Sequence, residues 1–170
     1  MLGGKSTIQN HGRNLNVGES VTVKEEAFDI NLTLSVGDVQ RNVVYTKRTS
    51  TGNRLEFNDG TFDIEGTYTK VKVNIHNNNN EEFQLSEYTL PMELLDSESN
   101  TLSECSYTIL DNRLENEKLP YIVPGNSSIS GYVYCKTDSN SGSILDIGVP
   151  SKALSNEKTL VFAEYKFKLK

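Results

Sequence analysis

Residues 67–100, TYTKVKVNIHNNNNEEFQLSEYTLPMELLDSESN, contain the pattern that decides the fold. Between residues 67 and 76, Thr, Val and Ile at the odd positions alternate with Tyr, Lys, Asn and His at the even positions. This period of two is typical of a half-buried β-strand. The asparagines at 77–80 then predict a turn, because Asn tolerates left-handed backbone, and a second apolar run begins at Phe83. The stretch therefore predicts two strands joined by a polar turn, as in a β-sandwich.

The same alternation recurs on both sides of this stretch. Its strongest example is residues 28–36, where apolar side chains occupy every even position. Further strands are expected at 129–137 and from Thr159 to the end of the chain, and helical periodicity is nearly absent. Seven to nine short strands separated by turns predict an all-β fold, specifically an immunoglobulin-like antiparallel β-sandwich.

The chain is long enough for one domain with a substantial core. At 170 residues, folding removes about 70% of the accessible surface of the unfolded chain. Residues 1–16 are polar and aperiodic, so we expect a flexible N-terminal lead-in, followed by the sandwich over residues 17–170. The pattern loosens between Gly37 and Gly66. We therefore expect an insertion at 37–66, which is either decoration or a place where the scaffold keeps its specificity.

The excess of acidic residues limits the choice of partners. With 17 basic and 23 acidic residues the net charge is −6, which repels phosphate backbones and anionic membrane surfaces. We therefore expect no nucleic-acid partner. No window approaches the roughly 18 to 20 consecutive apolar residues of a membrane-spanning helix, and the N-terminus lacks the pattern of a secretory signal. The opening residues resemble a junction on a trimmed chain, and an ordinary cytosolic start is the alternative.

Cys105 and Cys135 are the only two cysteines, and both fall in strand-like sequence. In an oxidising compartment they would pair as a disulfide. Closing a loop of this length would stabilise the fold by about 3 to 4 kcal/mol in the chain-entropy model. Two free buried thiols are the alternative, and the sequence does not decide between them.

The sequence gives little support for catalysis or metal binding. His11 and His76 are too few for a transition-metal site with three or four converging ligands. Asp96, Glu98 and Asn100 offer oxygen ligands on one turn, but the glycine and glutamate that an EF-hand loop needs are missing. We expect no enzyme, no cofactor and no metal.

Tyr132 and Tyr134 lie on one face of the strand expected at 129–137. Together with Tyr107 and Tyr121 they would form an exposed aromatic strip suited to contact with a protein or a glycan. The alternative is that these tyrosines cover a sheet face and keep their hydroxyl groups in water.

Three stretches carry a resemblance to a known family: VGESVTV at 17–23, the segment 70–100, and VPGNSSISGYVYC at 123–135. They look like the secreted, telokin-like, immunoglobulin-like domain of unknown function found mainly in Gram-positive bacteria. The resemblance spans about residues 17–170, and its motifs mark turns and strands, not chemistry. The 37–66 insertion is longer than the family pattern, and the lipoprotein signal that many members carry is missing.

The resemblance implies an extracellular domain tethered at the cell surface, with a signal or lipid anchor upstream of Met1, present as a monomer or weak dimer. We expect a non-catalytic binding or interaction module whose protein or glycan partner is unknown. One alternative is a secreted hydrolase or ligand-sequestering protein with its site in the 37–66 insertion. Another is an enzyme inhibitor that presents a loop.

Overall fold

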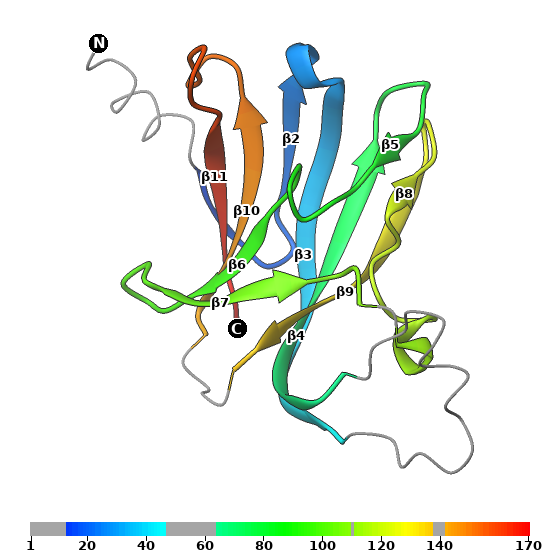
Figure 1. The fold of residues 1–170 in the computed structure, drawn as a ribbon, viewed down its shortest axis with the longest axis vertical. Coiled ribbons are helices and arrows are strands. Elements are labelled where there is room, and N and C mark those ends of the chain that lie inside the picture. Colours follow the sequence, from blue (N-terminus) through cyan, green and yellow to red (C-terminus); the bar gives the residue numbers. More distant parts are fainter. Residues whose placement is uncertain (1–12, 47–63, 110, 138–141) are drawn as a thin grey trace.

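The computed structural model describes residues 13–46, 64–109, 111–137 and 142–170, and these form an all-β fold (Figure 1). Its elements are β1 Arg13–Asn16, β2 Ser20–Glu25, the 3-10 turn η1 Glu26–Phe28, β3 Ile30–Tyr45, β4 Gly66–Asn77, β5 Phe83–Gln84, β6 Met92–Leu95, β7 Thr101–Ser106, the 3-10 turn η2 Asn112–Leu114, β8 Ile122–Val123, β9 Ser128–Lys136, β10 Ile144–Ser151 and β11 Val161–Lys168. The predicted all-β class is confirmed. Within these ranges, no helix has the length and apolar character needed to cross a membrane.

One long sheet makes both layers of the sandwich. Its strands run in the order β1-β11-β10-β6-β7-β9-β4-β3-β2, and β5 pairs with β8 separately. The β7–β9 ladder is short, with only Cys105 opposite Cys135 and Ser106 opposite Tyr134. The sheet turns at this junction, so that β11, β10, β6 and β7 face β9, β4, β3 and β2 across the core (Figure 1).

The alternating apolar side chains fill the space between the layers. On β3 and β4 they are almost fully buried at Ile30, Leu32, Leu34, Val36, Val71, Val73 and Ile75. The facing layer contributes Met92, Leu94, Leu145, Ile147, Val149 and Phe167 to the same cluster. Burying each of these side chains contributes roughly 1.5–3 kcal/mol to the hydrophobic driving force. The predicted core strands therefore provide the main core.

Two segments differ from the sequence prediction. Arg13–Asn16, in the predicted lead-in, forms β1 and pairs in parallel with β11, whereas the other named strands of the described chain pair antiparallel. Residues 37–45, in the predicted insertion, are the second half of β3 and pair with β4 through two register shifts. Burial still alternates there between half-buried odd positions and exposed even positions, but Arg41 on the first face and Val44 on the second obscure the apolar pattern in the sequence. Residues 1–12 and 47–63 lie outside the described residues.

A second, smaller cluster lies on the outer face of β4 and β9. It consists of Ile64, Tyr68, Leu114 and Tyr134, with Tyr45, Ile109 and Tyr132 packed against it. The connection between β7 and β8, which contains η2, therefore covers part of the sheet face that the alternating pattern assigned to solvent.

Candidate functional site

The predicted tyrosine contact strip is not formed. Tyr134 is 1% exposed, and its hydroxyl donates a hydrogen bond of 2.6 Å to Glu117 Oε2. Burial, with Glu117 as hydrogen-bond partner, raises the pKa of Tyr134. Tyr132 is half-buried, and its hydroxyl donates to Asp38 Oδ2 at 2.6 Å. Tyr107 is buried as well, whereas Tyr121 remains 55% exposed. The prediction fails at Tyr134 because Leu114 and its neighbours pack over this face.

Lys70 is the buried charge at the centre of this covered face. Its ammonium group lies 2.6 Å from Glu117 Oε2 and 4.5 Å from the centre of the Tyr132 ring. Burial by itself raises the pKa of Glu117, but the hydrogen bonds from Lys70 and Tyr134 and the charge of Lys70 together outweigh it, so the pKa lies below its ordinary value. Every polar group in this arrangement already has a partner, so we interpret it as a structural lock that holds the β7–β8 connection on the sheet.

Cys105 and Cys135 form a disulfide. The two residues are direct cross-strand partners on β7 and β9, with Cα atoms 4.1 Å apart. The bond therefore joins the two layers at the β7–β9 junction, where the ladder has only two residue pairs. In the described part of the chain it leaves no free thiol.

The described residues that the sequence offered as metal ligands form hydrogen bonds within the protein instead. Asp96 Oδ1 accepts hydrogen bonds from the backbone N–H groups of Glu98 and Asn100, at 2.9 Å each. His76 Nδ1 lies 2.6 Å from the Ser128 hydroxyl, and His11 lies outside the described residues. Among residues 13–46, 64–109, 111–137 and 142–170, no group of three or more His, Cys, Asp or Glu side chains is arranged to hold a metal ion.

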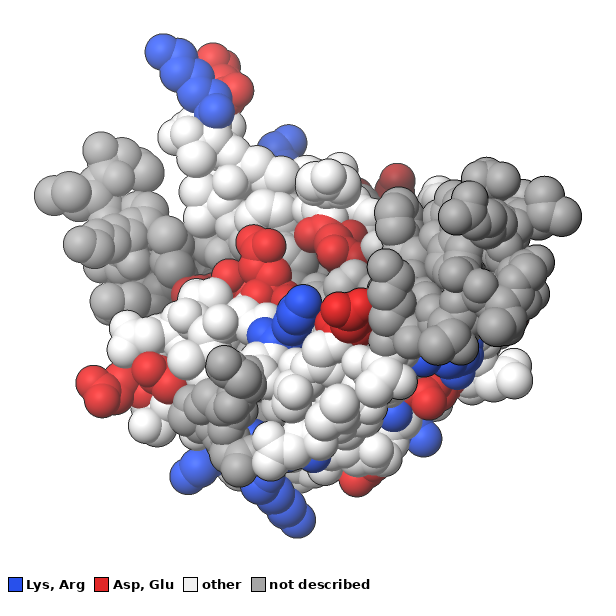
Figure 2. Space-filling view, turned by 60° about the horizontal axis from the view of Figure 1, so that its bottom comes forward, with Lys and Arg blue, Asp and Glu red and all other residues white. Residues whose placement is uncertain are grey.

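Acidic side chains form a row on the outer face of the β7-β6-β10 layer. Glu104, Glu93 and Asp146 are cross-strand neighbours at one register, and Lys166 follows on β11. Glu93 and Glu104 also line a hollow of about 590 Å³ beside β6 and β7. On the face drawn in Figure 2, acidic side chains gather around a hollow near the centre, with a basic side chain among them.

The most promising binding feature is an apolar slot, which shares Tyr88 with the hollow beside β6 and β7. It has a volume of about 150 Å³ and lies between η1 and β5 on one side and the β10–β11 connection on the other. Its walls come from five segments of the chain: Phe28, Ile30, Phe83, Tyr88, Thr89, Pro150 and Leu160. Leu160 is 51% exposed and Tyr88 is 89% exposed. The open end of the core therefore leaves large apolar side chains in contact with water.

Tyr88 is presented by a turn that is firmly held. The Ser86 hydroxyl accepts hydrogen bonds from the backbone N–H groups of Tyr88 and Thr89, at 3.2 and 3.1 Å. The adjacent Glu87 carboxylate accepts from the Ser106 hydroxyl at 3.0 Å and from the backbone N–H of Thr108 at 3.3 Å. The backbone of such a turn loses little conformational entropy when a partner binds Tyr88.

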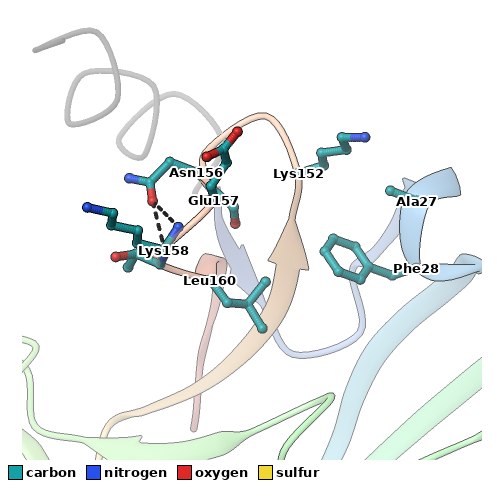
Figure 3. A pocket seen from close by; sticks show the side chains of 9 residues that line it. Ala27, Phe28, Lys152, Asn156, Glu157, Lys158 and Leu160 are labelled. Carbon is teal, nitrogen blue, oxygen red and sulfur yellow. Dashed lines mark hydrogen bonds between the residues drawn. The ribbon is translucent and has the colours of Figure 1, made fainter.

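The wall that carries Leu160 is fixed in the same way. Asn156 Oδ1 accepts hydrogen bonds from the backbone N–H groups of Lys158 and Thr159, at 2.8 and 2.9 Å. In Figure 3, Leu160 and Phe28 extend from opposite sides toward the open space between them, Lys152 lies above that space, and the Lys158 side chain points away from it. These residues line a wide hollow of about 750 Å³ that adjoins the slot.

Nothing in the sequence pattern placed these residues together. Phe28 fits the alternation of the following strand, yet it lies in η1. Tyr88 stands between polar residues in SEYT, whereas Leu160 directly precedes the apolar residues at 161–163. A large apolar residue isolated in a turn has no period-two partner to bury it. Tyr88 was therefore a signal for an exposed binding surface, and Leu160 gave no such signal.

Two solved structures share the fold of this chain at low sequence identity. A secreted protein of Mycobacterium tuberculosis, MPT63, matches with a TM-score of 0.56 and 9% identity, over 92% of this chain and 97% of that chain. The yjhA protein of Bacillus subtilis matches with a TM-score of 0.54 and 11% identity, over 92% of this chain and 99% of that chain. No protein-family model matches the sequence, and no curated protein matches it either. These likenesses show a shared β-sandwich architecture.

Proposed function

We propose that this chain is a non-catalytic extracellular binding module that holds an apolar side chain of a protein partner in the slot. The observation that carries the proposal is the pair of large apolar side chains, Tyr88 and Leu160, that remain exposed beside a preformed apolar cavity. Exposed apolar groups around a pocket are typical of interaction sites, where a few buried anchors supply most of the binding energy.

The size and lining of the slot favour a protein side chain over a sugar. An apolar cavity of about 150 Å³ accepts a benzene ring, so a phenylalanine or leucine side chain fits the slot. Phe28, Ile30, Phe83 and Pro150 offer no side-chain hydrogen-bonding group. Among the lining residues, only the hydroxyl groups of Tyr88 and Thr89 could replace the hydration that the hydroxyl groups of a sugar would lose there, so binding of a sugar is costly.

Three observations support the extracellular part of the proposal. The Cys105–Cys135 disulfide is of the kind that persists in oxidising compartments. The fold resembles that of MPT63, a secreted protein. The motifs at 17–23, 70–100 and 123–135 resemble the telokin-like secreted family, and membership of that family, with anchoring at the cell surface, belongs to this proposal.

The non-catalytic part rests on the chemistry of the slot. None of the seven residues that line it is a carboxylate, histidine, cysteine or lysine, the groups that most often act as general acids, bases or nucleophiles. The alternative of a hydrolase with its site at 37–66 concerns a segment of which residues 47–63 lie outside the described residues.

A peptide-display selection tests the proposal. A random peptide library is selected on the folded, oxidised protein and then assayed on a slot variant, Tyr88→Ser/Leu160→Ser. The matched control is Leu102→Ser/Tyr121→Ser, which removes the same two residue types from exposed sites elsewhere, 38% and 55% exposed.

We expect selected peptides to share one large apolar residue. Their affinity should fall at least about tenfold on the slot variant, the loss that follows removal of a binding anchor, and should stay unchanged on the control. Equal affinity for the slot variant and the wild type, or no selected peptide at all, would show that the slot is not the binding site.

A further inference from the structure

Charge is distributed unevenly around the slot. On the side of η1 and β5, a hollow of about 550 Å³ shares Phe28 and Phe83 with the slot and carries three acidic residues, Asp29, Glu81 and Glu82. On the side of the β10–β11 connection, the wide hollow carries Lys152 and Lys158 together with Glu157. On the first side, all the charged residues described are therefore acidic. On the second side, basic and acidic residues lie together.

The three carboxylates on the acidic side are exposed and form no ion pair with the described residues. Asp29, Glu81 and Glu82 all lie at the surface. The salt bridges of the described chain involve other acidic residues, namely Glu26, Asp111 and Glu117. Like charges that lie close together repel one another, and an opposite charge brought by a partner relieves that repulsion.

The backbone that carries these carboxylates is rigid. Asn77 is fully buried, and its Nδ2 donates hydrogen bonds to the carbonyl oxygen atoms of Glu81 at 2.8 Å and Val123 at 3.1 Å. Asn79 Nδ2 donates to the carbonyl oxygen of Asp29 at 3.0 Å. The asparagine turn therefore ties Asp29 and Glu81 to the same framework beside the slot, and the acidic hollow is preorganised.

We infer that the occupant of the slot is a protein segment whose apolar anchor residue is flanked by lysine or arginine, with the basic side chain lying over the hollow of Asp29, Glu81 and Glu82. The inference rests on the proposed function and names the class of partner. The acidic hollow adjoins the slot through Phe28 and Phe83. A basic residue next to the anchor therefore reaches the carboxylates while the anchor is buried.

Other occupants of the slot are disfavoured by charge. A second copy of this chain carries the same net charge of −6, and it would bring its own acidic residues toward this surface. An anionic membrane surface would be repelled for the same reason. A basic protein segment is attracted instead, and its association is accelerated at low ionic strength.

A charge-swap selection tests the inference. The peptide library is selected in parallel on the wild type, on Glu81→Lys/Glu82→Lys, and on the control Glu98→Lys/Glu115→Lys. The control changes the net charge by the same amount at two exposed positions away from the slot. Peptides from each selection are sequenced, and their affinities are measured at low and high salt.

We expect peptides selected on the wild type and the control to carry Lys or Arg beside the apolar anchor. Peptides selected on Glu81→Lys/Glu82→Lys should carry Asp or Glu at that place. Each exposed ion pair should change affinity roughly two- to fivefold, and high salt should remove most of that difference.

The outcomes separate this inference from the proposed function. Apolar anchors that depend on Tyr88 and Leu160 but show no preference for flanking charge would overturn the inference and leave the proposed function intact. Peptides that bind independently of Tyr88 and Leu160 would overturn both. Concentration-dependent dimerisation of the wild type that is abolished by Leu160→Ser would assign the slot to a second copy and would also overturn the inference.

Discussion

Replacement of Asp146 by asparagine should stabilise the protein at neutral and alkaline pH. Asp146 is 5% exposed on β10, and its Oδ1 has no hydrogen-bond partner within the described chain. Burial raises the pKa of Asp146 to about 8. The hydrogen bond with Glu164 and the charges of Glu164 and Glu93 contribute to this same increase, and the charge of Lys166 opposes it. The folded protein therefore favours a protonated Asp146.

The sign and size of the effect follow from proton linkage. In the unfolded chain an aspartate has a pKa of about 3.9. Between pH 4 and 8 the folded state therefore binds more protons than the unfolded state, and the free energy of unfolding decreases as the pH rises. The slope is about 1.4 kcal/mol per pH unit while Asp146 remains protonated only in the folded state. From pH 5 to pH 8 the protein should lose about 3–4 kcal/mol of stability from this residue.

Urea unfolding at pH 5, 6, 7 and 8 would measure this loss directly. Asp146→Asn keeps the shape of the protonated acid and has no ionisation to suppress. It should match the wild type only below about pH 4, and its advantage should grow by about 3–4 kcal/mol between pH 5 and pH 8. The control Glu104→Gln removes an exposed carboxylate from the same acidic row. Parallel stability–pH profiles for the wild type and Asp146→Asn would refute the reasoning.

Three further predictions concern the framework. Cys105→Ala/Cys135→Ala removes a cross-link between residues 30 apart and should lower the free energy of unfolding by about 3–4 kcal/mol, with reduced wild type showing the same midpoint in urea. Lys70→Met should cost about 3 kcal/mol because it leaves Glu117 unpaired, whereas Lys70→Met/Glu117→Leu should be nearly neutral; equal costs for both would contradict the buried ion pair. Asn77→Ala should cost about 2–3 kcal/mol through lost buried hydrogen bonds, and an unchanged thermal midpoint would show that the asparagine turn does not depend on it.

The disulfide and the tyrosines show where local pattern stops being informative. Both cysteines stand in strands, but only the register of β7 against β9 places them opposite one another. Tyr132 and Tyr134 alternate with core residues just as exposed residues do. Whether that outer face meets water depends on the β7–β8 connection, which folds back over it and brings Leu114 onto the ring of Tyr134.

The sequence by itself determined the all-β class and the identity of the core strands. A period of two is a local property, because successive side chains of a strand point to opposite faces whatever the strand pairs with. The same reasoning identified the asparagine turn after β4, since the backbone preference of asparagine is also local. The second half of β3 is harder to recognise, because its odd positions are only half-buried and include Arg41, whereas Val44 is exposed.

Only the tertiary structure decided the candidate site. The slot is assembled from η1, β3, β5, the turn at 86–89, β10 and the residue before β11, segments that no sequence spacing relates to one another. They meet because one long sheet turns at the β7–β9 junction and closes into two layers, which leaves the end of the core open. Exposure of Tyr88 and Leu160 is thus a consequence of where the layers end, and side-chain alternation carries no information about that boundary.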